Sequence, residues 1–359
     1  MTKKVLLFSS VEWGWLKQRP HFMAEELAER GCEITYLAID PKGAKKKQIS
    51  SRLTVCEISS VRGYMRTPLI RWLACQKIKA ALEGEAFDTV ILTNPIQLRL
   101  LPRKILQQAR VIYDCMDLLP AFYTGRQKRL MEKLERELSG RAERITVSAQ
   151  PLQTVLQKQY GVPAAKFRAI YNAASLKDCE KVAAEKDEKQ LQHPALIYIG
   201  TIEHWLEMDR LQRFMETHPD VHLYMVGKAK QEQEMQMARI PNCHVTGPLE
   251  HTEALRYLKA ADVALLPFKP GGLVDMVDPV KMYEYLAMRK PVVASYWPAL
   301  EHFRSLEGIL FYTNDAEFEA AVEQSIRADA VKVSQSFVVN NTWSARAGQM
   351  LNVMNEFDQ

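Results

Sequence analysis

The chain has 359 residues, of which 47% are hydrophobic and 25% are charged, and its formal net charge is +5. These proportions are typical of a soluble globular protein, and no run approaches the roughly 20 apolar residues that span a bilayer. One hydrophobic core seldom organises so long a chain, so we expect two domains. The N-terminal MTKKVLLFSSVEWG has a short apolar run without a small-residue cleavage site, which predicts a first core strand and not a signal peptide.

The six cysteines are scattered along the chain and form no CxxC pair. This spacing disfavours both a zinc site and a disulfide framework. Cys32 and Cys115 lie in or beside apolar segments, where we expect buried thiols. Reduced cysteines predict a cytoplasmic protein.

Strand and helix patterns alternate through residues 1–174. Such alternation predicts a doubly wound α/β domain, in which a parallel sheet carries helices on both faces. The expected strands are residues 3–9, 33–39, 54–58, 88–93, 110–115 and 144–149. The expected helices are residues 19–31, 68–84, 95–107, 126–142 and 151–161.

A polar stretch, residues 175–194, is predicted to link this domain to a second one, residues 195–335, and a last helix lies within 336–359. The second domain repeats the alternation. Its expected strands are residues 195–200, 221–227, 244–247, 263–268, 290–295 and 308–313, and its expected helices are residues 208–219, 231–240, 251–261, 279–287 and 315–327. Two such domains would face each other across a cleft lined by the loops that follow the strands.

Positive charge is concentrated in residues 41–47 and 61–79. Two interpretations stay open: a solvated surface, or contact with an anionic membrane surface or an anionic acceptor. In the helix expected after Pro68, the apolar residues 70, 73, 74, 78 and 81 share one face, as in a core-facing helix. The membrane interpretation therefore depends on the basic flanks and on Trp72.

The loop after the first strand, SSVEWGWLKQRPHF, contains no GxGxxG, which disfavours a nicotinamide-dependent dehydrogenase. Gly14 would allow a ligand to approach the backbone. Arg19 stands at the start of a helix, where backbone N–H groups favour an anion. The alternative is that Trp13 and Trp15 pack on the domain edge and that Arg19 is a surface cap.

Two carboxylates follow the strand at residues 110–115. Asp114 ends this strand and Asp117 lies just beyond it. Either could act as a general base or bind a sugar hydroxyl at the strand's carboxyl end. Asp117 could instead cap the following helical turn.

Three glycines end strands of the second domain. Gly200, followed by Thr201, suits a phosphate through close backbone approach and a hydroxyl donor. Gly227 and Gly247 end the next two strands, and a planar base could lie between their loops against Leu249.

The segment DPVKMYEYLAMRKPVVAS, residues 278–295, joins a charged helix start to a buried strand. Asp278 and Pro279 are expected as N-cap and first residue of the helix. Lys281 then lies beside the free N–H groups of the first turn, which suits a phosphate. Glu284 lies three residues further on the same side, where a carboxylate suits ribose hydroxyls.

This segment resembles the nucleotide-binding signature of GT-B glycosyltransferases of the family-four type. The segments WGWLKQRPHFMAEELAERG, GTIEHWLEMD, VHLYMVG and GPLEHTEALRYLKAADVALLPF follow the same pattern in the same order, so the resemblance covers most of the chain. It is greatest for bacterial teichuronic-acid and exopolysaccharide glycosyltransferases and weaker for xanthan glucuronosyltransferase. The resemblance implies an N-terminal acceptor domain, a C-terminal donor domain and a last helix that returns to the first domain.

The resemblance also implies roles for individual residues. Lys281 would contact the donor diphosphate, and Glu284 would bind the ribose. Donor-binding residues would be Gly14, Gly200, Thr201, Gly227, Leu249, Lys281, Tyr283 and Glu284. Arg19 and His21 would contact the acceptor or a phosphate, and Asp117, or else Asp114, would be the catalytic base.

One position departs from the family pattern. Retaining members often carry a glutamate eight residues before the ribose-binding one, and here that position is Met276. Whether the reaction inverts or retains configuration therefore stays open. No DxD motif lies near a cleft strand, so we expect a metal-independent enzyme without a cofactor, which uses lysine and helix N–H groups to stabilise the leaving diphosphate.

We therefore expect transfer of a sugar from a nucleoside diphosphate, most simply UDP, to a saccharide or lipid-linked acceptor. The expected location is the cytoplasm, with possible peripheral contact at the inner membrane face, and no nucleic-acid partner is expected. Two alternatives remain. A nucleotide-sugar epimerase of the same fold would release no UDP to an acceptor. A non-catalytic partner would keep Lys281 and Glu284 but would not need Asp117.

Overall fold

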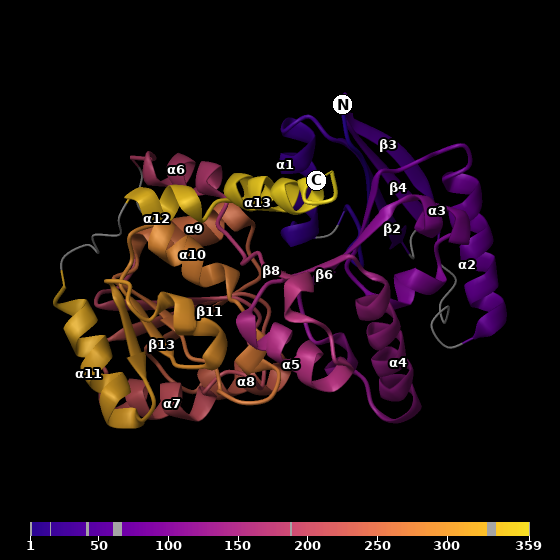
Figure 1. Ribbon diagram of the computed structural model, residues 1–359. Helices are drawn as coiled ribbons and strands as arrows, with labels where there is room; N and C mark the ends of the chain where they lie inside the picture. Colours follow the sequence, from indigo (N-terminus) through magenta and orange to yellow (C-terminus); the bar gives the residue numbers. More distant parts are fainter. Residues whose placement is uncertain are drawn as a thin grey trace. The chain divides into compact units, whose positions relative to one another are not determined.

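The computed structural model describes residues 2–14, 16–40, 43–59, 67–186, 189–328 and 335–358 (Figure 1). Outside these ranges lie Trp15, residues 41–42 of the basic segment 41–47, and residues 60–66, which include the first six residues of the basic segment 61–79. The chain divides into two compact units, one of Met1–Tyr171 with Trp343–Gln359 and one of Asn172–Thr342. Each unit holds one sheet with a largely parallel ladder, which confirms the predicted class of two doubly wound α/β domains.

The first unit is built on an eight-stranded sheet in the order β3-β4-β2-β1-β5-β6-β7-β8. All neighbouring strands pair in parallel except β3 and β4. The order reverses between β1 and β5, which places the loop after β1 at the switch point of this sheet. The strands are β1 Lys4–Phe8, β2 Glu33–Asp40, β3 Lys45–Ser50, β4 Leu53–Ser59, β5 Thr89–Leu92, β6 Arg110–Cys115, β7 Arg144–Val147 and β8 Phe167–Ala169.

The helices of the first unit include the C-terminal one. They are α1 Arg19–Glu29, α2 Pro68–Ala81, α3 Arg103–Gln108, α4 Gly125–Arg141, α5 Gln150–Tyr160 and α13 Trp343–Asn355. The last of these packs along α1 although more than 300 residues separate them (Figure 1). The rings of Phe22 and Trp343 stack with centroids 5.0 Å apart, and Arg30 donates to the carbonyl of Ser344 over 2.7 Å.

Two elements of the first unit differ from the prediction. The lysine-rich residues 45–47 belong to strand β3, an edge strand with all six residues exposed. Charged side chains on such an edge discourage further strand pairing. The helix expected over residues 95–107 is divided at Pro102 into a 3₁₀ turn, Pro95–Arg99, and α3, because proline cannot supply the N–H that a continuous helix needs.

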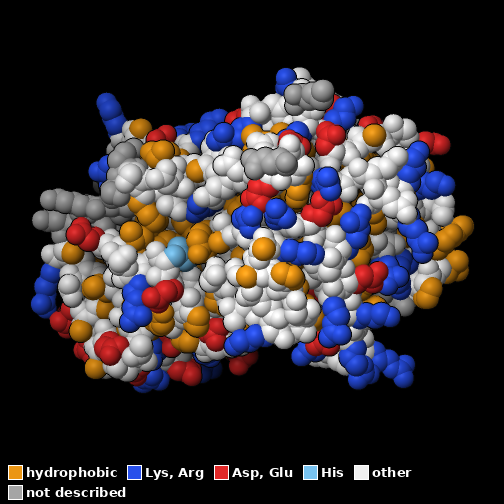
Figure 2. Space-filling model, in the orientation of Figure 1, with side chains coloured by type: hydrophobic (Ala, Val, Ile, Leu, Met, Phe, Trp, Pro, Cys, Tyr) orange, Lys and Arg blue, Asp and Glu red, His pale blue; other side chains and the backbone are white. Residues whose placement is uncertain are grey.

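Helix α2 buries only part of its apolar surface. Ala74 and Ile78 are buried, as expected for the core-facing stripe, but Leu73 of the same stripe is 39% exposed. With Leu69 at 65% and Trp72 at 56% exposure, it forms a second, solvent-facing apolar strip. Figure 2 shows hydrophobic side chains among Lys and Arg side chains along the edge where α2 lies in Figure 1. No helix in the described part of the chain is long and apolar enough to span a bilayer.

The second unit has a six-stranded, fully parallel sheet in the order β11-β10-β9-β12-β13-β14. Numbered within the unit, this is the order 3-2-1-4-5-6 of dinucleotide-binding domains, with its switch point between β9 and β12. The strands are β9 Ala195–Ile199, β10 His222–Val226, β11 Cys243–Gly247, β12 Val263–Leu266, β13 Val292–Ser295 and β14 Ile309–Tyr312. Ligand-contacting loops are therefore expected after β9 and β12.

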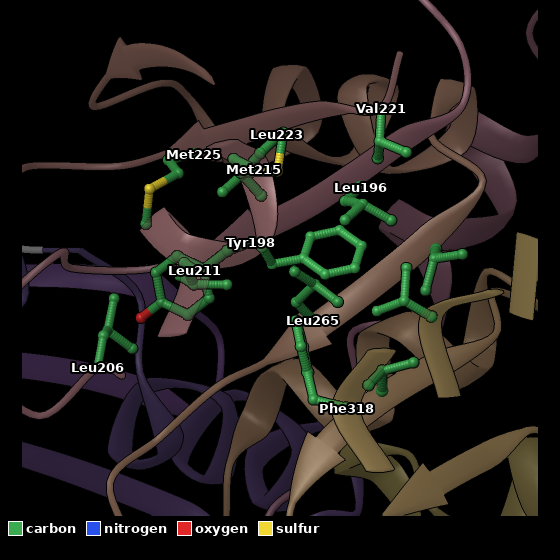
Figure 3. Packing of buried hydrophobic residues seen from close by; sticks show 14 of the residues in the cluster. Leu196, Tyr198, Leu206, Leu211, Met215, Val221, Leu223, Met225, Leu265 and Phe318 are labelled. Carbon is green, nitrogen blue, oxygen red and sulfur yellow. The ribbon is translucent and has the colours of Figure 1, made fainter. Parts of the chain in front are cut away.

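A single apolar layer fixes this sheet to the helices on one of its faces (Figure 3). Leu196 and Leu223 from the strands meet Leu211, Met215 and other side chains from the helices, and all are almost completely buried. Burying such side chains stabilises the fold by about 1.5–3 kcal/mol each. This packing gives the strand ends, and hence the loops that follow them, a rigid base.

The helices of the second unit begin inside the segment predicted as a linker. Residues 176–183 form α6, because Cys179 and Val182 share one buried face. The remaining helices are α7 Met208–Thr217, α8 Gln231–Met237, α9 His251–Ala260, α10 Val280–Ala287, α11 Asp315–Ile326 and α12 Gln335–Asn340. Helices α6, α9, α10 and α12 lie together in Figure 1, and contacts join α6 to α9 and α10, and α10 to α12.

Candidate functional site

Three glycine-containing loops meet at the carboxyl ends of β9, β10 and β11. The Gly200 N–H donates to the Val226 carbonyl over 2.9 Å, and the Gly227 N–H donates to the Gly247 carbonyl over 3.0 Å. A Cβ on Gly227, which has φ +151°, would lie 1.9 Å from the Gly200 carbonyl oxygen. The backbones are therefore so close that only glycine fits, and the predicted loops form one continuous rim.

The remaining predicted residues of this rim are accessible. Thr201 is exposed, and Leu249 is partly exposed in the loop after β11. The buried Tyr198 hydroxyl donates to the Thr201 carbonyl over 3.0 Å, which fixes the backbone beyond Gly200. The rim thus offers fixed backbone groups, one hydroxyl and an apolar side chain, a set that suits a phosphate and a planar base.

Helix α10 is attached to the same rim through Tyr285. This side chain is completely buried, and its hydroxyl oxygen accepts the Ile199 N–H over 2.9 Å. Ile199 is the last residue of β9, directly before Gly200. The attachment therefore fixes α10, through its second half, relative to the first glycine loop.

Lys281 and Glu284 are brought together on α10 as the sequence predicted. The Lys281 ammonium donates to Glu284 Oε2 over 2.6 Å. The other carboxylate oxygen, Oε1, lies 2.9 Å from His251 Nε2 at the start of α9. His251 Nδ1 in turn lies 3.4 Å from a carboxylate oxygen of Asp178 on α6. Glu284 is 4% exposed, whereas the side chains of Lys281 and His251 remain partly accessible.

The electrostatics of this cluster follow from its geometry. Burial alone would raise the pKa of Glu284, but the Lys281 charge and the hydrogen bond and charge of His251 bring it down to about 2. The hydrogen bond to Glu284 raises the pKa of His251 above its usual value of 6.5, although burial and Lys281 act against this rise. The cluster is therefore a buried carboxylate between the Lys281 ammonium and a histidine whose pKa is raised.

His251 and Asp178 were not predicted as site residues. They lie 33 and 106 positions before Glu284 in the sequence, and neither spacing is typical of a motif. The weak signal was a histidine that directly follows a glycine loop and begins a helix. Only the tertiary structure shows that this helix start lies beside α10.

Tyr283 lies inside the second unit, which corrects the expectation that its side chain contacts the donor. It is 1% exposed, and its hydroxyl lies 3.1 Å from both carboxylate oxygens of Asp278 and 3.1 Å from His302 Nε2. Asp278 is also not the N-cap of α10, because the helix begins at Val280 after Pro279. Its carboxylate instead accepts the Asn172 N–H over 2.6 Å.

In the first unit, Gly14 is exposed within the loop after β1. Buried side chains hold this loop: Glu57 accepts the Trp13 N–H over 2.8 Å, and Tyr36 donates to the Val11 carbonyl over 2.7 Å. His21 Nδ1 accepts the Gln18 N–H, so its Nε2 donates to the Glu12 carbonyl over 2.9 Å.

This arrangement corrects the expectation that His21 contacts the acceptor. Its side chain is buried, and both ring nitrogens bond to the backbone of its own loop. Burial lowers the pKa of His21, so the ring is neutral. Its contribution is to hold the loop that carries Gly14.

Arg19 and Asp114 form a buried ion pair. Two guanidinium nitrogens lie 3.0 and 2.9 Å from the two carboxylate oxygens of Asp114, and Thr146 donates to the same carboxylate over 2.6 Å. Arg19 also donates to the carbonyls of Ile170 and Tyr171. Both charges are therefore used inside the unit, which corrects the roles expected of Arg19 as an anion contact and of Asp114 as a base.

Asp117 differs from Asp114 in being accessible. It follows β6, the residue is exposed, and among the described residues the hydrogen bonds to Asp117 go to its backbone carbonyl and not to its carboxylate. Partial desolvation raises the pKa of the Asp117 carboxyl, and the Arg19 charge opposes this rise. A carboxylate that is accessible, unused by the fold and raised in pKa suits a general base.

The described residues contain one group of side chains with metal-ligand spacing, His218, Glu319 and Glu323. It lies on the surface, where His218 pairs with Glu319 and Glu323 pairs with Arg327. None of these residues belongs to the glycine rim or to the cluster around Glu284.

Two family profiles match the sequence, one in each unit. The profile described as Glycosyltransferase Family 4 matches residues 21–178, and the one described as Glycosyl transferases group 1 matches residues 193–328. Together they take in most of the chain. The chain belongs to the GT-B glycosyltransferases.

This GT-B chain is also similar to TuaH of Bacillus subtilis (strain 168), which is provisionally named a teichuronic acid biosynthesis glycosyltransferase. The identity is 27% over 203 residues, which are 53% of this chain and 51% of TuaH. The chain thus spans about half the length of the curated relative that it matches.

Solved structures share the GT-B fold over nearly the whole chain. Anabaena HepE, crystallised with UDP and glucose, is 14% identical with a TM-score of 0.68 and coverage of 98% of this chain and 99% of its own. A UDP-forming trehalose-phosphate synthase from Burkholderia xenovorans, in complex with glucose-6-phosphate, is 11% identical with a TM-score of 0.72 and coverage of 98% and 100%. WaaG, involved in lipopolysaccharide biosynthesis, is 13% identical with a TM-score of 0.60 and coverage of 97% and 95%.

We predict that Gly227→Ala displaces the rim of this GT-B chain. The new Cβ would lie 1.9 Å from the Gly200 carbonyl oxygen, a backbone atom that cannot move without its loop. The expected loss of unfolding free energy is about 1–3 kcal/mol, measured by urea denaturation.

Gly140→Ala is the matched control, because its Cβ meets nothing within 4 Å and the residue lies inside α4. This substitution should be neutral or stabilise by up to about 1 kcal/mol. A Gly227→Ala protein as stable as the wild type would contradict the close backbone approach.

Proposed function

We propose that the chain transfers a sugar from a nucleoside diphosphate, UDP in the first instance, to a saccharide or lipid-linked acceptor in cell-surface polysaccharide biosynthesis. The observation that carries this proposal is the placement of Lys281 and Glu284 at the start of α10, fixed to the glycine rim by Tyr285. The names of TuaH, HepE and the UDP-forming synthase support the reaction class and the choice of UDP.

The donor end of the reaction needs a group that stabilises the leaving diphosphate. Lys281 is the second residue of α10, so it belongs to the first turn, whose N–H groups have no partner within the helix. Together the ammonium and these N–H groups would bind the diphosphate and offset the negative charge that develops as the glycosidic bond breaks. Glu284 would accept hydrogen bonds from the ribose hydroxyls, and Thr201 and Leu249 would contact the phosphate and the base.

The acceptor end needs a base for the attacking hydroxyl. Asp117 is accessible at the carboxyl end of β6, whereas Asp114 is fully engaged by Arg19 and Thr146. We assign to Asp117 the removal of the acceptor proton, as an inverting transfer requires. Gly14, on the loop held by His21 and Tyr36, stays a predicted donor contact.

The exposed strip of α2 gives the first unit a surface suited to a lipid-linked acceptor. Leu69, Trp72 and Leu73 lie at spacings of three and four residues, so they share one helix face. The exposed Lys79 lies on the same helix, and the lysines of β3 add positive charge to the same unit. Apolar side chains with flanking basic residues suit the interface of an anionic membrane, so we place the enzyme at the cytoplasmic membrane face.

The donor assignment predicts that UDP stabilises the wild-type protein in a thermal-shift assay, more than GDP, ADP or CMP do. Binding to the folded state alone raises apparent stability once the ligand exceeds its Kd. Lys281→Ala should weaken UDP binding on the order of 10- to 100-fold in calorimetry, because the diphosphate loses a charged donor.

Lys133→Ala, which removes an exposed lysine from α4 in the first unit, serves as the control and should bind UDP normally. Unchanged UDP affinity in Lys281→Ala would remove the proposed diphosphate contact. Binding of no nucleotide by the wild type would instead favour the non-catalytic alternative.

The base assignment predicts that Asp117→Asn binds UDP as the wild type does but transfers sugar at least about 100-fold more slowly, since general base catalysis typically contributes 10²–10⁴-fold. UDP release in the presence of membrane-extracted acceptor lipids is the measurement. Retained turnover in Asp117→Asn would exclude this residue as the base.

The membrane assignment predicts that the protein sediments with phosphatidylglycerol vesicles and that Leu69→Ala/Trp72→Ala reduces the bound fraction severalfold, because apolar burial is lost. Met235→Ala, which truncates an exposed apolar side chain of the second unit, is the control. Equal sedimentation of all three proteins would argue against contact through α2.

A further inference from the structure

Ligand binding must change which groups compensate the negative charge of the Glu284 carboxylate. In the structure Lys281 and His251 each occupy one oxygen of this buried carboxylate. The proposed function, however, requires the Lys281 ammonium at the diphosphate and a free Glu284 oxygen for the ribose. A carboxylate with 4% exposure cannot lose its main cation without another one, because an uncompensated buried charge is strongly unfavourable.

We propose that His251 is the positioning residue that keeps Glu284 ionised and oriented when Lys281 turns to the diphosphate, and that nucleotide binding is therefore coupled to proton uptake by His251. The proposal rests on the proposed function of Lys281 and Glu284. It assigns His251 no contact with the nucleotide, because its Nε2 faces Glu284 Oε1 and its Nδ1 faces Asp178.

The charged groups around His251 determine the direction of this coupling. Glu284 and Lys281 face it from α10, and Asp178 faces it from α6. Both carboxylates raise the pKa of His251, and the Lys281 charge lowers it. When Lys281 moves toward a negatively charged diphosphate, its charge lowers the pKa of His251 less. The pKa of His251 should therefore be higher in the complex than in the free protein.

This direction fixes the pH dependence of binding. At a pH between the pKa of His251 in the free protein and its pKa in the complex, His251 holds a proton in the complex that it lacks in the free protein. Because the free value already lies above 6.5, this window lies at neutral to mildly alkaline pH. UDP affinity should fall as the pH rises through the window, by up to tenfold for each unit by which the two pKa values differ.

The structure offers a conservative variant that separates the charge from the hydrogen bond. In His251→Gln the side-chain amide can still donate to Glu284 but cannot take up a proton. This variant should fold normally, bind UDP about tenfold more weakly at neutral pH and show no proton uptake, because a neutral donor is weaker than a charged one. In Asp178→Asn the uptake should persist but move to lower pH.

The experiment is isothermal titration calorimetry of UDP in pairs of buffers with different ionisation enthalpies, at about pH 7 and about pH 8. The slope of the observed enthalpy against the buffer ionisation enthalpy gives the number of protons bound. UDP titrates on its own, so the test is the difference between wild type and His251→Gln, in which the contribution of UDP is the same. His218→Gln, which breaks a histidine–carboxylate pair outside the site, is the matched control and should behave as the wild type.

The expected result is a net uptake in the wild type and in His218→Gln that disappears in His251→Gln. Equal proton counts in wild type and His251→Gln would overturn the proposal, and so would an increase of UDP affinity with pH that depends on His251. Failure of the proposed function has a different signature, because the wild type would then bind no UDP in any buffer.

Discussion

The proposed donor site depends on one buried charge, the carboxylate of Glu284. A carboxylate at 4% exposure needs cationic or hydrogen-bonding partners, and the fold supplies two of them from different helices. Helix α10 provides Lys281 three residues earlier, and the start of α9 provides His251. The position of both helices is thereby tied to a single carboxylate, and any ligand that attracts Lys281 must alter the same balance. Binding of a ligand to Lys281 is therefore coupled to the compensation of the Glu284 charge.

The rim beside this charge is held by backbone groups and not by side chains. The backbones at Gly200 and Gly227 approach so closely that a Cβ on Gly227 would clash with the Gly200 carbonyl, and Tyr285 connects the end of β9 to α10. Rigid placement of this kind matters for a transferase, because a diphosphate is recognised by several fixed donors at once. The parallel sheet below supplies the rigidity, since its strand ends are set by a continuous apolar layer (Figure 3). The apolar packing of the sheet and the close approach of the backbones therefore both hold the rim that lies beside the Glu284 charge.

Local patterns predicted the fold and part of the site. Alternating periods of apolar residues located most strands, but β3 was missed because its lysines resemble a solvated loop, and the three-residue β8 was too short to recognise. Lys281 and Glu284 were predicted correctly as neighbours, because a spacing of three places both on one helix side. The same helix geometry explains why the side chain of Tyr283 does not lie beside them. Adjacent residues of a helix point about 100° apart, so the ring of Tyr283 enters the core. His251 and Asp178 were beyond reach, because only tertiary structure brings α6, α9 and α10 together.

The two units shift the pKa of a histidine in opposite directions. His21 is surrounded by its own loop, accepting one backbone N–H and donating to one backbone carbonyl, so burial keeps it neutral. His251 faces two carboxylates instead, and their charge raises its pKa despite its burial. A neutral histidine can hold a loop in one geometry at any pH above its own titration, and this suits the fixed backbone around Gly14. A histidine between carboxylates can respond to a change of charge, and this suits the unit in which a nucleotide would bring several negative charges. The groups around each histidine account for the difference between them. The backbone groups around His21 suit it to hold a loop, and the carboxylates around His251 suit it to respond to a change of charge.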